Sequence, residues 1–382
     1  MNKILTWIIV IVIVIVGGYY LLFRDKSGVS DETGPIKIGF MGSLTGDAAS
    51  YGEPQRDALK LAVEDINKSG GVNGRLIEVI YEDGKCNGKD GANAAQKLIN
   101  VDKVKVILGG SCSSETLAAV PIAEKEKVVI VTGSATSPDL INKSKFFFRV
   151  YPNDSVQGRI LAEGAYNIKG WKKVAVVQEQ TDYALGVYKI FAAKFEELGG
   201  KLVREEFPST ITDFRSVLTK LRGEKPDALL VSVQTAAMGE RVFKQLRDLN
   251  WKPALIVNDV IGGDVPTVTN NKDILEGALA ADFLLDENNE KLKKLTETFK
   301  ITYNSDIRYP TYTSAVYDSL YLIVDAIKAV GYDGEKIAEW ARTSLKDFPG
   351  ASGLITVGSD GERVGGHVLK VVKNGKVEIY QP

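Results

Sequence analysis

Residues 109–116 read GGSCSSET, so a thiol stands among hydroxyl side chains directly after a pair of glycines. Such a group could act as a nucleophile, form half of a disulfide or cradle an anion. A nucleophile at a strand-to-helix turn needs the pattern G-x-S-x-G and a base that takes its proton. Here no glycine completes that pattern, and the only histidine, His367, stands near the far end of the chain. We therefore expect a protein that is not an enzyme.

The position of this stretch suggests two other roles. It follows the apolar run 103–110, which reads as a central strand, and it precedes a helix that we expect to begin near Ser114 or Glu115. Open parallel sheets bind ligands at the carboxyl ends of their strands, and the free N–H groups at a helix start favour an anion. Alternatively, Ser113 or Ser114 simply caps the helix, with Glu115 or Thr116 in its first turn. Position alone leaves both roles open.

Cys86 and Cys112 are the only two thiols of the chain. Each follows a strand-like run, and the two runs are neighbours along the chain. In an oxidising compartment we expect them to form one disulfide, worth about 3–4 kcal/mol in the chain-entropy model. The alternative is a pair of buried free thiols.

The composition excludes several classes of function. Of 382 residues, 48 are lysine or arginine and 49 are aspartate or glutamate, so no net field attracts nucleic acid. One histidine and two cysteines are too few for a zinc site of nitrogen and sulfur ligands. A carboxylate site for a hard cation stays open, but we expect neither a metal nor a cofactor. The hydrophobic content of 44% suffices for a globular protein of two domains.

The N-terminal residues 4–23, ILTWIIVIVIVIVGGYYLLF, carry no charge. A helix of about 20 residues, at about 1.5 Å per residue, reaches the roughly 30 Å of a bilayer core. A cleaved signal peptide would have a shorter apolar run and small residues at its cleavage site. We therefore expect an uncleaved hydrophobic helix that anchors the chain in a membrane, with a cleaved signal as the alternative. Residues 24–34 have the composition of a linker.

From Pro35 onward, short apolar runs alternate with amphipathic stretches. The runs are IKIGFMG, KVKVILGG, KVVIVTG, KKVAVVQE, DALLVSVQ and PALIVND. They are typical of strands buried on both faces of a parallel sheet, and the stretches between them show helical spacing, as in residues 59–66. Roughly three strand–helix units precede Tyr151, and about three more lie in residues 172–277. This pattern predicts an α/β fold of two doubly wound lobes with parallel sheets.

The last region of the chain is a different mixture. We expect a strand in GALAADFLL, helices at about 289–304 and 313–330, and a tail from residue 353 to 379 that reads as a hairpin. Its Ser-Asp-Gly and Lys-Asn-Gly segments suit tight turns.

Three long segments resemble a known family. They are IKIGFMGSLTGDAASYGEPQRDALKLAVEDINKSGGVNGRLIEVIYEDGKC, GGSCSSETLAAVPIAEKEKVVIVTGSATSPDL and FFFRVYPNDSVQG. They are similar to the leucine/isoleucine/valine-binding family of type 1 periplasmic solute-binding proteins. The resemblance implies an extracytoplasmic protein that closes around an amino acid and delivers it to the permease of an ABC transporter. The family disulfide falls on positions that match Cys86 and Cys112.

The resemblance also implies how the chain is divided. Family members have two α/β lobes joined by three crossovers. We expect residues 1–34 to be the anchor or signal segment with its linker, residues 35–152 and 282–350 to form lobe 1, and residues 153–281 and 351–382 to form lobe 2. A sensor that signals to a membrane partner, or a binder of an amide or short carboxylate, are the alternatives on the same fold.

The residues that match the family's ligand site are Tyr51, Ser113, Ser134, Thr136, Tyr183, Gln234, Asp259 and Tyr309. The resemblance assigns the ligand's α-carboxylate to Ser113, contacts with its α-ammonium and carboxylate to Ser134 and Thr136, and aromatic walls to the tyrosines. A zwitterion also needs an anion for its ammonium, for which Asp259 is the candidate. Alternatively, Asp259 caps a strand end and Tyr183 lies in a surface loop.

One departure from the family bears on selectivity. A tyrosine of the branched-chain binders is replaced here by Gln234 or Thr235. We therefore do not expect strict selectivity for leucine, isoleucine and valine.

Overall fold

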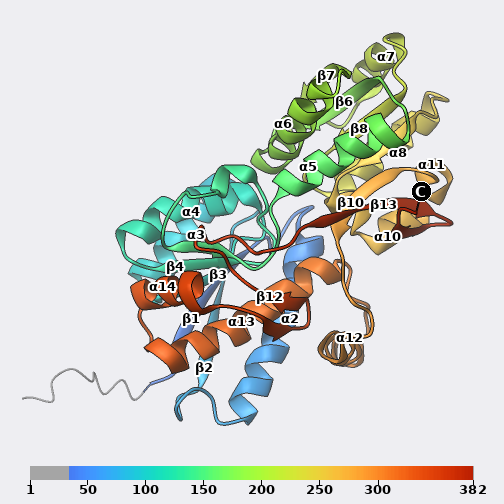
Figure 1. Ribbon diagram of the computed structural model, residues 1–382. Helices are drawn as coiled ribbons and strands as arrows, with labels where there is room; N and C mark the ends of the chain where they lie inside the picture. Colours follow the sequence, from blue (N-terminus) through green and yellow to red (C-terminus); the bar gives the residue numbers. More distant parts are fainter. Residues whose placement is uncertain (1–33, 382) are drawn as a thin grey trace, which may run out of the picture. The chain divides into compact units, whose positions relative to one another are not determined.

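The first sheet is built from the apolar runs of the N-terminal third of the chain (Figure 1). The computed structural model describes residues 34–381, so the hydrophobic run 4–23 lies outside the described residues. Five strands are parallel and follow the order β2-β1-β3-β4-β5. Their bounds are β1 Ile36–Gly42, β2 Ile77–Asp83, β3 Val106–Gly109, β4 Val129–Thr132 and β5 Phe147–Arg149.

Helices cover both faces of this sheet. On one face α2 (Ala49–Lys68) packs with α13 (Pro310–Val330), which comes from the last third of the chain. On the other face lie α3 (Gly88–Asn100) and α4 (Ser113–Lys125). The alternation of buried strand and one-sided helix predicted this arrangement because each face of the sheet must be covered.

The second sheet has the order β14-β13-β10-β9-β8-β6-β7. Its strands are β6 Lys173–Glu179, β7 Lys201–Phe207, β8 Ala228–Ser232, β9 Ala254–Val257, β10 Leu279–Phe283, β13 His367–Lys373 and β14 Lys376–Ile379. The strands from β6 to β10 are parallel, whereas β13 runs antiparallel to both β10 and β14. The helices that follow the parallel strands or lead into them are α5 Asp154–Glu163, α6 Asp182–Glu197, α7 Arg215–Gly223 and α8 Ala236–Asp248.

The chain passes three times between the two sheets. It crosses after β5, returns after β10 to form α12 (Glu290–Tyr303), α13 and α14 (Gly334–Ser344), and crosses again to β13. The predicted α/β fold of two lobes with parallel sheets is thus confirmed. Among residues 34–381, no helix combines the length and the apolar character that a bilayer crossing requires.

The C-terminal tail differs from the single hairpin expected. Its first part forms β12 (Gly353–Ile355), which pairs with β11 (Phe348–Gly350) in a separate small sheet. Only β13 and β14 form the expected hairpin, around the Asn374-Gly375 turn. The tail is divided between two sheets because β13 pairs with β10. The local sequence does not reveal this pairing.

The remaining short elements are η1 Pro138–Leu140, η2 Gly164–Ile168, α9 Asp259–Gly262, α10 Val265–Asn270 and α11 Lys272–Leu275. Of these, α9 is the one that positions a candidate site residue, because Asp259 is its first residue.

Candidate ligand-binding site

The GGSCSSET stretch forms the turn from β3 into α4, as expected. Cys112 is the N-cap residue of α4, and the Glu115 side chain accepts a hydrogen bond from the Cys112 N–H at 2.9 Å. The Ser113 hydroxyl instead accepts from the N–H of Ser137, 3.1 Å away. Because the cap is made by Cys112 and Glu115, the idea that Ser113 or Ser114 only caps the helix is wrong.

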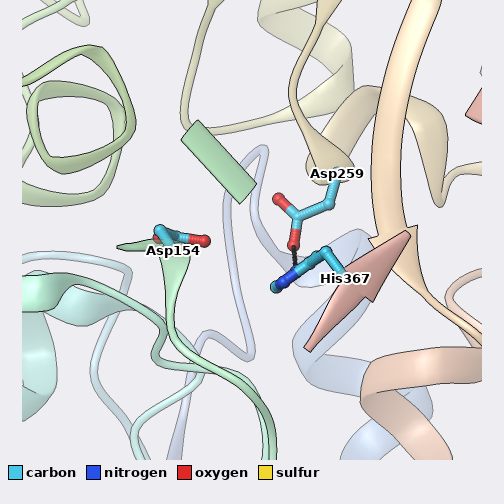
Figure 2. Close-up of side chains that lie close together, drawn as sticks. All are labelled: Asp154, Asp259 and His367. Carbon is cyan, nitrogen blue, oxygen red and sulfur yellow. Dashed lines mark ion pairs between the residues drawn. The ribbon is translucent and has the colours of Figure 1, made fainter. Parts of the chain in front are cut away.

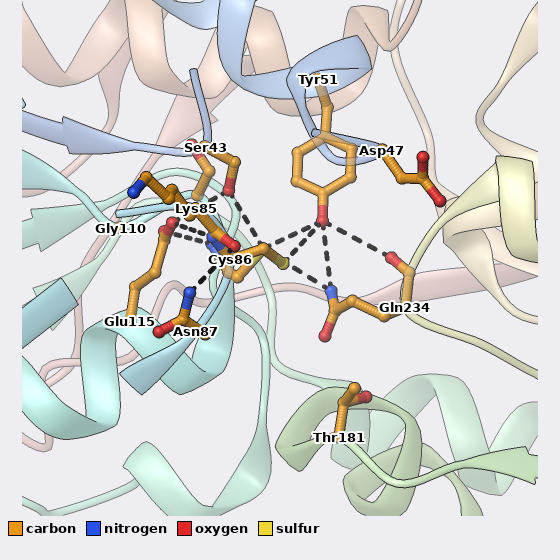
Figure 3. The surroundings of a disulfide bond; sticks show 12 residues. Ser43, Asp47, Tyr51, Lys85, Cys86, Asn87, Gly110, Glu115, Thr181 and Gln234 are labelled. Atoms are coloured by element: carbon orange, nitrogen blue, oxygen red, sulfur yellow. Dashed lines mark hydrogen bonds between the residues drawn. A yellow bond between two sulfur atoms is a disulfide. The ribbon is translucent and has the colours of Figure 1, made fainter. Parts of the chain in front are cut away.

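Glu115 joins the two turns that carry the cysteines (Figure 3). Its Oε1 accepts from the Ser43 hydroxyl at 2.9 Å and from the Cys86 N–H at 2.7 Å. Burial raises the pKa of this carboxyl above its ordinary value, although the donors around it act in the opposite direction. Cys86 and Cys112 form the predicted disulfide, with Cα atoms 5.1 Å apart.

Most of the predicted site residues meet around one cavity of about 10 Å³. Its lining is Tyr51, Ser111, Cys112, Ser113, Ser134, Tyr183, Gln234, Val260 and Tyr312. These residues come from the strand ends of both sheets and from helices α2, α4, α6, α9 and α13. Space of this size holds about one water molecule, so a larger ligand requires these side chains to move apart.

The other predicted site residues, Thr136, Asp259 and Tyr309, lie beside the cavity without lining it. Asp259 contacts two lining tyrosines, as described below. Thr136 is fully buried, and its carbonyl accepts from the Asp154 N–H at 3.0 Å. The ring of Tyr309 stands edge-on to that of Tyr51, with centroids 5.5 Å apart. Tyr309 therefore supports the aromatic wall from behind.

One end of the site is acidic. The Asp259 carboxylate accepts a hydrogen bond from the Tyr183 hydroxyl and another from the Tyr312 hydroxyl, the latter at 2.5 Å. Tyr183 is only 3% exposed, so its placement in a surface loop is wrong. Burial and the charge of Asp259 raise the pKa of both phenols, which keeps them protonated as donors.

Asp154 and His367 complete this end of the site (Figure 2). The two residues and Asp259 are buried, and one ligand atom of each lies within 4.8 Å of the others. His367 Nε2 is 3.7 Å from Asp259 Oδ2. Burial works against ionisation of Asp259, but its contacts with His367, Tyr183 and Tyr312 prevail and lower its pKa. Burial and the nearby Asp259 charge raise the pKa of Asp154 well above its usual range.

Gln234 lies where the second sheet approaches Tyr51 (Figure 3). Its backbone N–H donates to Glu179 at 2.7 Å, and its side-chain Nε2 lies 3.3 Å from the Tyr51 hydroxyl. Thr235, the other candidate for the altered family position, caps α8 by accepting from the Met238 N–H. The structure therefore puts Gln234 at the cavity and Thr235 at the helix start.

The sequence reasoning missed several residues of this region: Ser111, Cys112 as a lining residue, Asp154, Val260, Tyr312 and His367. Tyr312 could have been found, because it follows Tyr309 by about one helical turn once the helix is started at Pro310. Asp154 begins a helix after an Asn cap, which is a readable signal for position but not for function. His367 had no local signal, since only the pairing of β13 with β10 brings it here.

Comparisons with known proteins identify the family of the chain. A family model for periplasmic binding proteins matches residues 35–373. The chain is 30% identical over 319 residues to the leucine-, isoleucine-, valine-, threonine- and alanine-binding protein of Pseudomonas aeruginosa. The matched region covers 82% of this chain and 84% of that protein.

Solved structures show the same likeness. A leucine-binding protein LivK of Thermotoga maritima is 30% identical, has a TM-score of 0.82, and the match covers 91% of this chain and 98% of that one. The branched-chain amino acid substrate-binding protein LivJ of Streptococcus pneumoniae, in complex with isoleucine, is 27% identical with a TM-score of 0.80, covering 91% and 100% of the two chains. The chain described here belongs to the periplasmic binding protein family.

Proposed function

We propose that this protein is an extracytoplasmic solute-binding protein that closes around an amino acid and delivers it to an ABC transporter. The observation that carries the proposal is that groups suited to an anion line one buried cavity, while a carboxylate suited to a cation lies directly beside it. The first turn of α4, with Ser113, offers N–H and hydroxyl groups to a carboxylate, and Asp259 offers a carboxylate to an ammonium. An α-amino acid carries these two charges on one carbon.

The ligand site as proposed consists of the predicted residues together with Tyr312, while Asp154 and His367 surround the acidic end. In this site the ligand is bound without chemical conversion. The division into lobes at residues 152, 281 and 350 is part of the same proposal, and ligand binding would hold the lobes together. The relatives named above, which bind leucine, isoleucine, valine and related amino acids, support an amino acid as the ligand class.

We further propose that residues 4–23 hold the protein at the outer face of a cytoplasmic membrane. Their uncharged composition supports this proposal. The disulfide between Cys86 and Cys112 also supports an extracytoplasmic location, because such bonds persist in oxidising compartments.

A thermal unfolding screen of the full-length protein against the common amino acids tests the proposed function. A ligand at a hundred times its Kd should stabilise the protein by about 2.7 kcal/mol. Asp259→Ala should weaken binding by about 30-fold or more, because the ligand's ammonium then lies buried without its counter-charge. Asp248→Ala, at an exposed position, is the matched control and should leave binding unchanged.

Two results would contradict the proposal. One is the absence of stabilisation by any α-amino acid. The other is an Asp259→Ala protein that folds normally by circular dichroism and binds the ligand as tightly as the wild type.

A further inference from the structure

The side chain of Gln234 has one polar atom without a partner. Its Oε1 is buried and accepts no hydrogen bond from the described residues, while the whole residue is only 6% exposed. The rest of Gln234 is engaged: the backbone N–H donates to Glu179, and the carbonyl lies 3.5 Å from the Tyr51 hydroxyl. In Figure 3 the Nε2 atom faces Tyr51 and the amide oxygen points away from it. Gln234 therefore brings one unused acceptor to the wall of the cavity.

Different parts of the cavity lining suit different chemical groups of a ligand. If the proposed function is correct, the ligand's carboxylate takes the wall at Ser113, and its ammonium takes the wall next to Asp259. The rest of the lining includes Ser111, Val260 and a polar wall formed by Tyr51, Cys112 and Gln234, which contact one another. The Tyr51 hydroxyl lies 2.9 Å from Cys112 Sγ and 3.3 Å from Gln234 Nε2. A ligand side chain in this part of the cavity would meet the polar wall, with Val260 as the aliphatic residue of the lining.

An aliphatic side chain is a poor match for this wall. It would seal the Gln234 amide oxygen away from both water and a donor, and a buried polar atom without a hydrogen bond is costly. A side chain with a hydroxyl or an amide group removes that cost. A hydroxyl both donates and accepts, so it would satisfy the Gln234 amide in either of its two orientations.

We propose that Gln234 makes this site selective for amino acids with a hydrogen-bonding side chain, a hydroxyl or an amide, over aliphatic ones of the same size. The inference rests on the proposed function, because it assumes an α-amino acid held at Ser113 and Asp259. It deepens that function by naming the class of ligand.

Threonine and valine provide the test, since they have nearly the same shape and differ by a hydroxyl in place of a methyl. Isothermal titration of the full-length protein should show threonine binding at least about tenfold tighter than valine. The variant Gln234→Met keeps the length of the side chain but removes the amide. In this variant the preference for threonine over valine should fall to less than about threefold or reverse. Gln96→Met, at an exposed position on α3, is the matched control and should keep the wild-type preference.

The outcomes separate the two hypotheses. If valine binds the wild-type protein as tightly as threonine, the inference is wrong and the proposed function stands. If no α-amino acid binds, both are wrong. The comparison of threonine with valine in the wild-type protein tests the selectivity even if Gln234→Met fails to fold. If a folded Gln234→Met protein keeps the wild-type preference for threonine, the assignment of the selectivity to Gln234 is wrong.

Discussion

Two buried aspartates of the site have opposite tendencies to ionise. Asp259 accepts from two tyrosine hydroxyls and lies near His367, and its pKa is lowered. Asp154 is equally buried, and the charge of Asp259 adds to the effect of burial in raising its pKa. Two neighbouring carboxyls in a site of low polarity do not both ionise readily. We therefore assign the negative charge of this pair to Asp259 and the proton to Asp154.

The stability of Asp259→Asn relative to the wild type should depend on pH. Because the folded-state pKa of Asp259 lies below its unfolded value, its ionised form stabilises the fold above the ordinary aspartate value of about 3.9, and this contribution is lost as the pH falls through the folded-state pKa. At pH 7 we expect Asp259→Asn to be less stable by about 1–3 kcal/mol, because the two tyrosine donors lose a charged acceptor.

Urea unfolding of both proteins at several pH values between 7 and 3 measures this difference. It should stay constant down to about pH 4 and shrink below that value. A difference that does not change over the whole range would show that Asp259 is not the ionised member of the pair. The exposed Asp248→Asn should show no comparable effect.

The residues of the site could be put forward only where a local pattern or the family resemblance marks them. Ser113 was put forward because its stretch follows an apolar run at a helix start and matches the family's ligand site, and Gln234 because it matches a family position that is a tyrosine in the branched-chain binders. The interaction of Asp259 with Tyr312, by contrast, joins elements 53 positions apart, and no spacing in the sequence encodes it.

At the scale of elements, the turn from β3 into α4 depends on a side chain that does not line the cavity. Glu115 is fully buried and holds three donors: the Ser43 hydroxyl and the N–H groups of Cys86 and Cys112. It thereby fixes the start of the helix that presents Ser113. The disulfide links the same two turns covalently.

Glu115→Gln should destabilise the fold by about 1–3 kcal/mol. An amide has one acceptor oxygen, so its NH₂ group would face either the Cys86 N–H or the Cys112 N–H, and a buried donor would lose its partner. Urea unfolding is the measurement, and Glu124→Gln, exposed on the same helix, is the control. Equal stability of the two variants would show that Glu115 does not have this role.

Most strands and helices were predictable because burial imposes a periodicity on the sequence. The helix expected at 289–304 occupies Glu290–Tyr303, where Asn289 caps it by accepting from the N–H groups of Lys291 and Leu292. The tail was less predictable, because the choice of β10 as the partner of β13 depends on a strand about 90 positions earlier. Strand pairing over such a distance is set by the packed fold and not by local preference.

At the scale of the whole molecule, the contacts between the two sheet regions differ in kind. Arg241 and Asp47 form an ion pair at 2.7 Å, but both side chains are well exposed. Tyr312 and Asp259 form a buried hydrogen bond at 2.5 Å. Exposed ion pairs are worth about 0–1 kcal/mol, whereas a buried hydrogen bond to a charged group is worth about 1.5–3 kcal/mol.

Arg241→Ala should therefore change the affinity for the amino acid by less than about threefold, and Tyr312→Phe should weaken it by about tenfold or more. Titration calorimetry of both variants, with the tightest ligand of the wild type, makes the comparison. A larger loss in Arg241→Ala than in Tyr312→Phe would mean that the surface ion pair, and not the buried site, governs binding.

The antiparallel strand β13 has a consequence for the synthesis of the protein. His367 is its first residue, and this strand is synthesised after the parts of the chain that carry Asp154 and Asp259. The acidic end of the site, begun by these two aspartates, is therefore complete only when β13 has been made and has added to the sheet beside β10. A chain that stops before β13 would lack the histidine of this site, so we expect ligand capture to require β13.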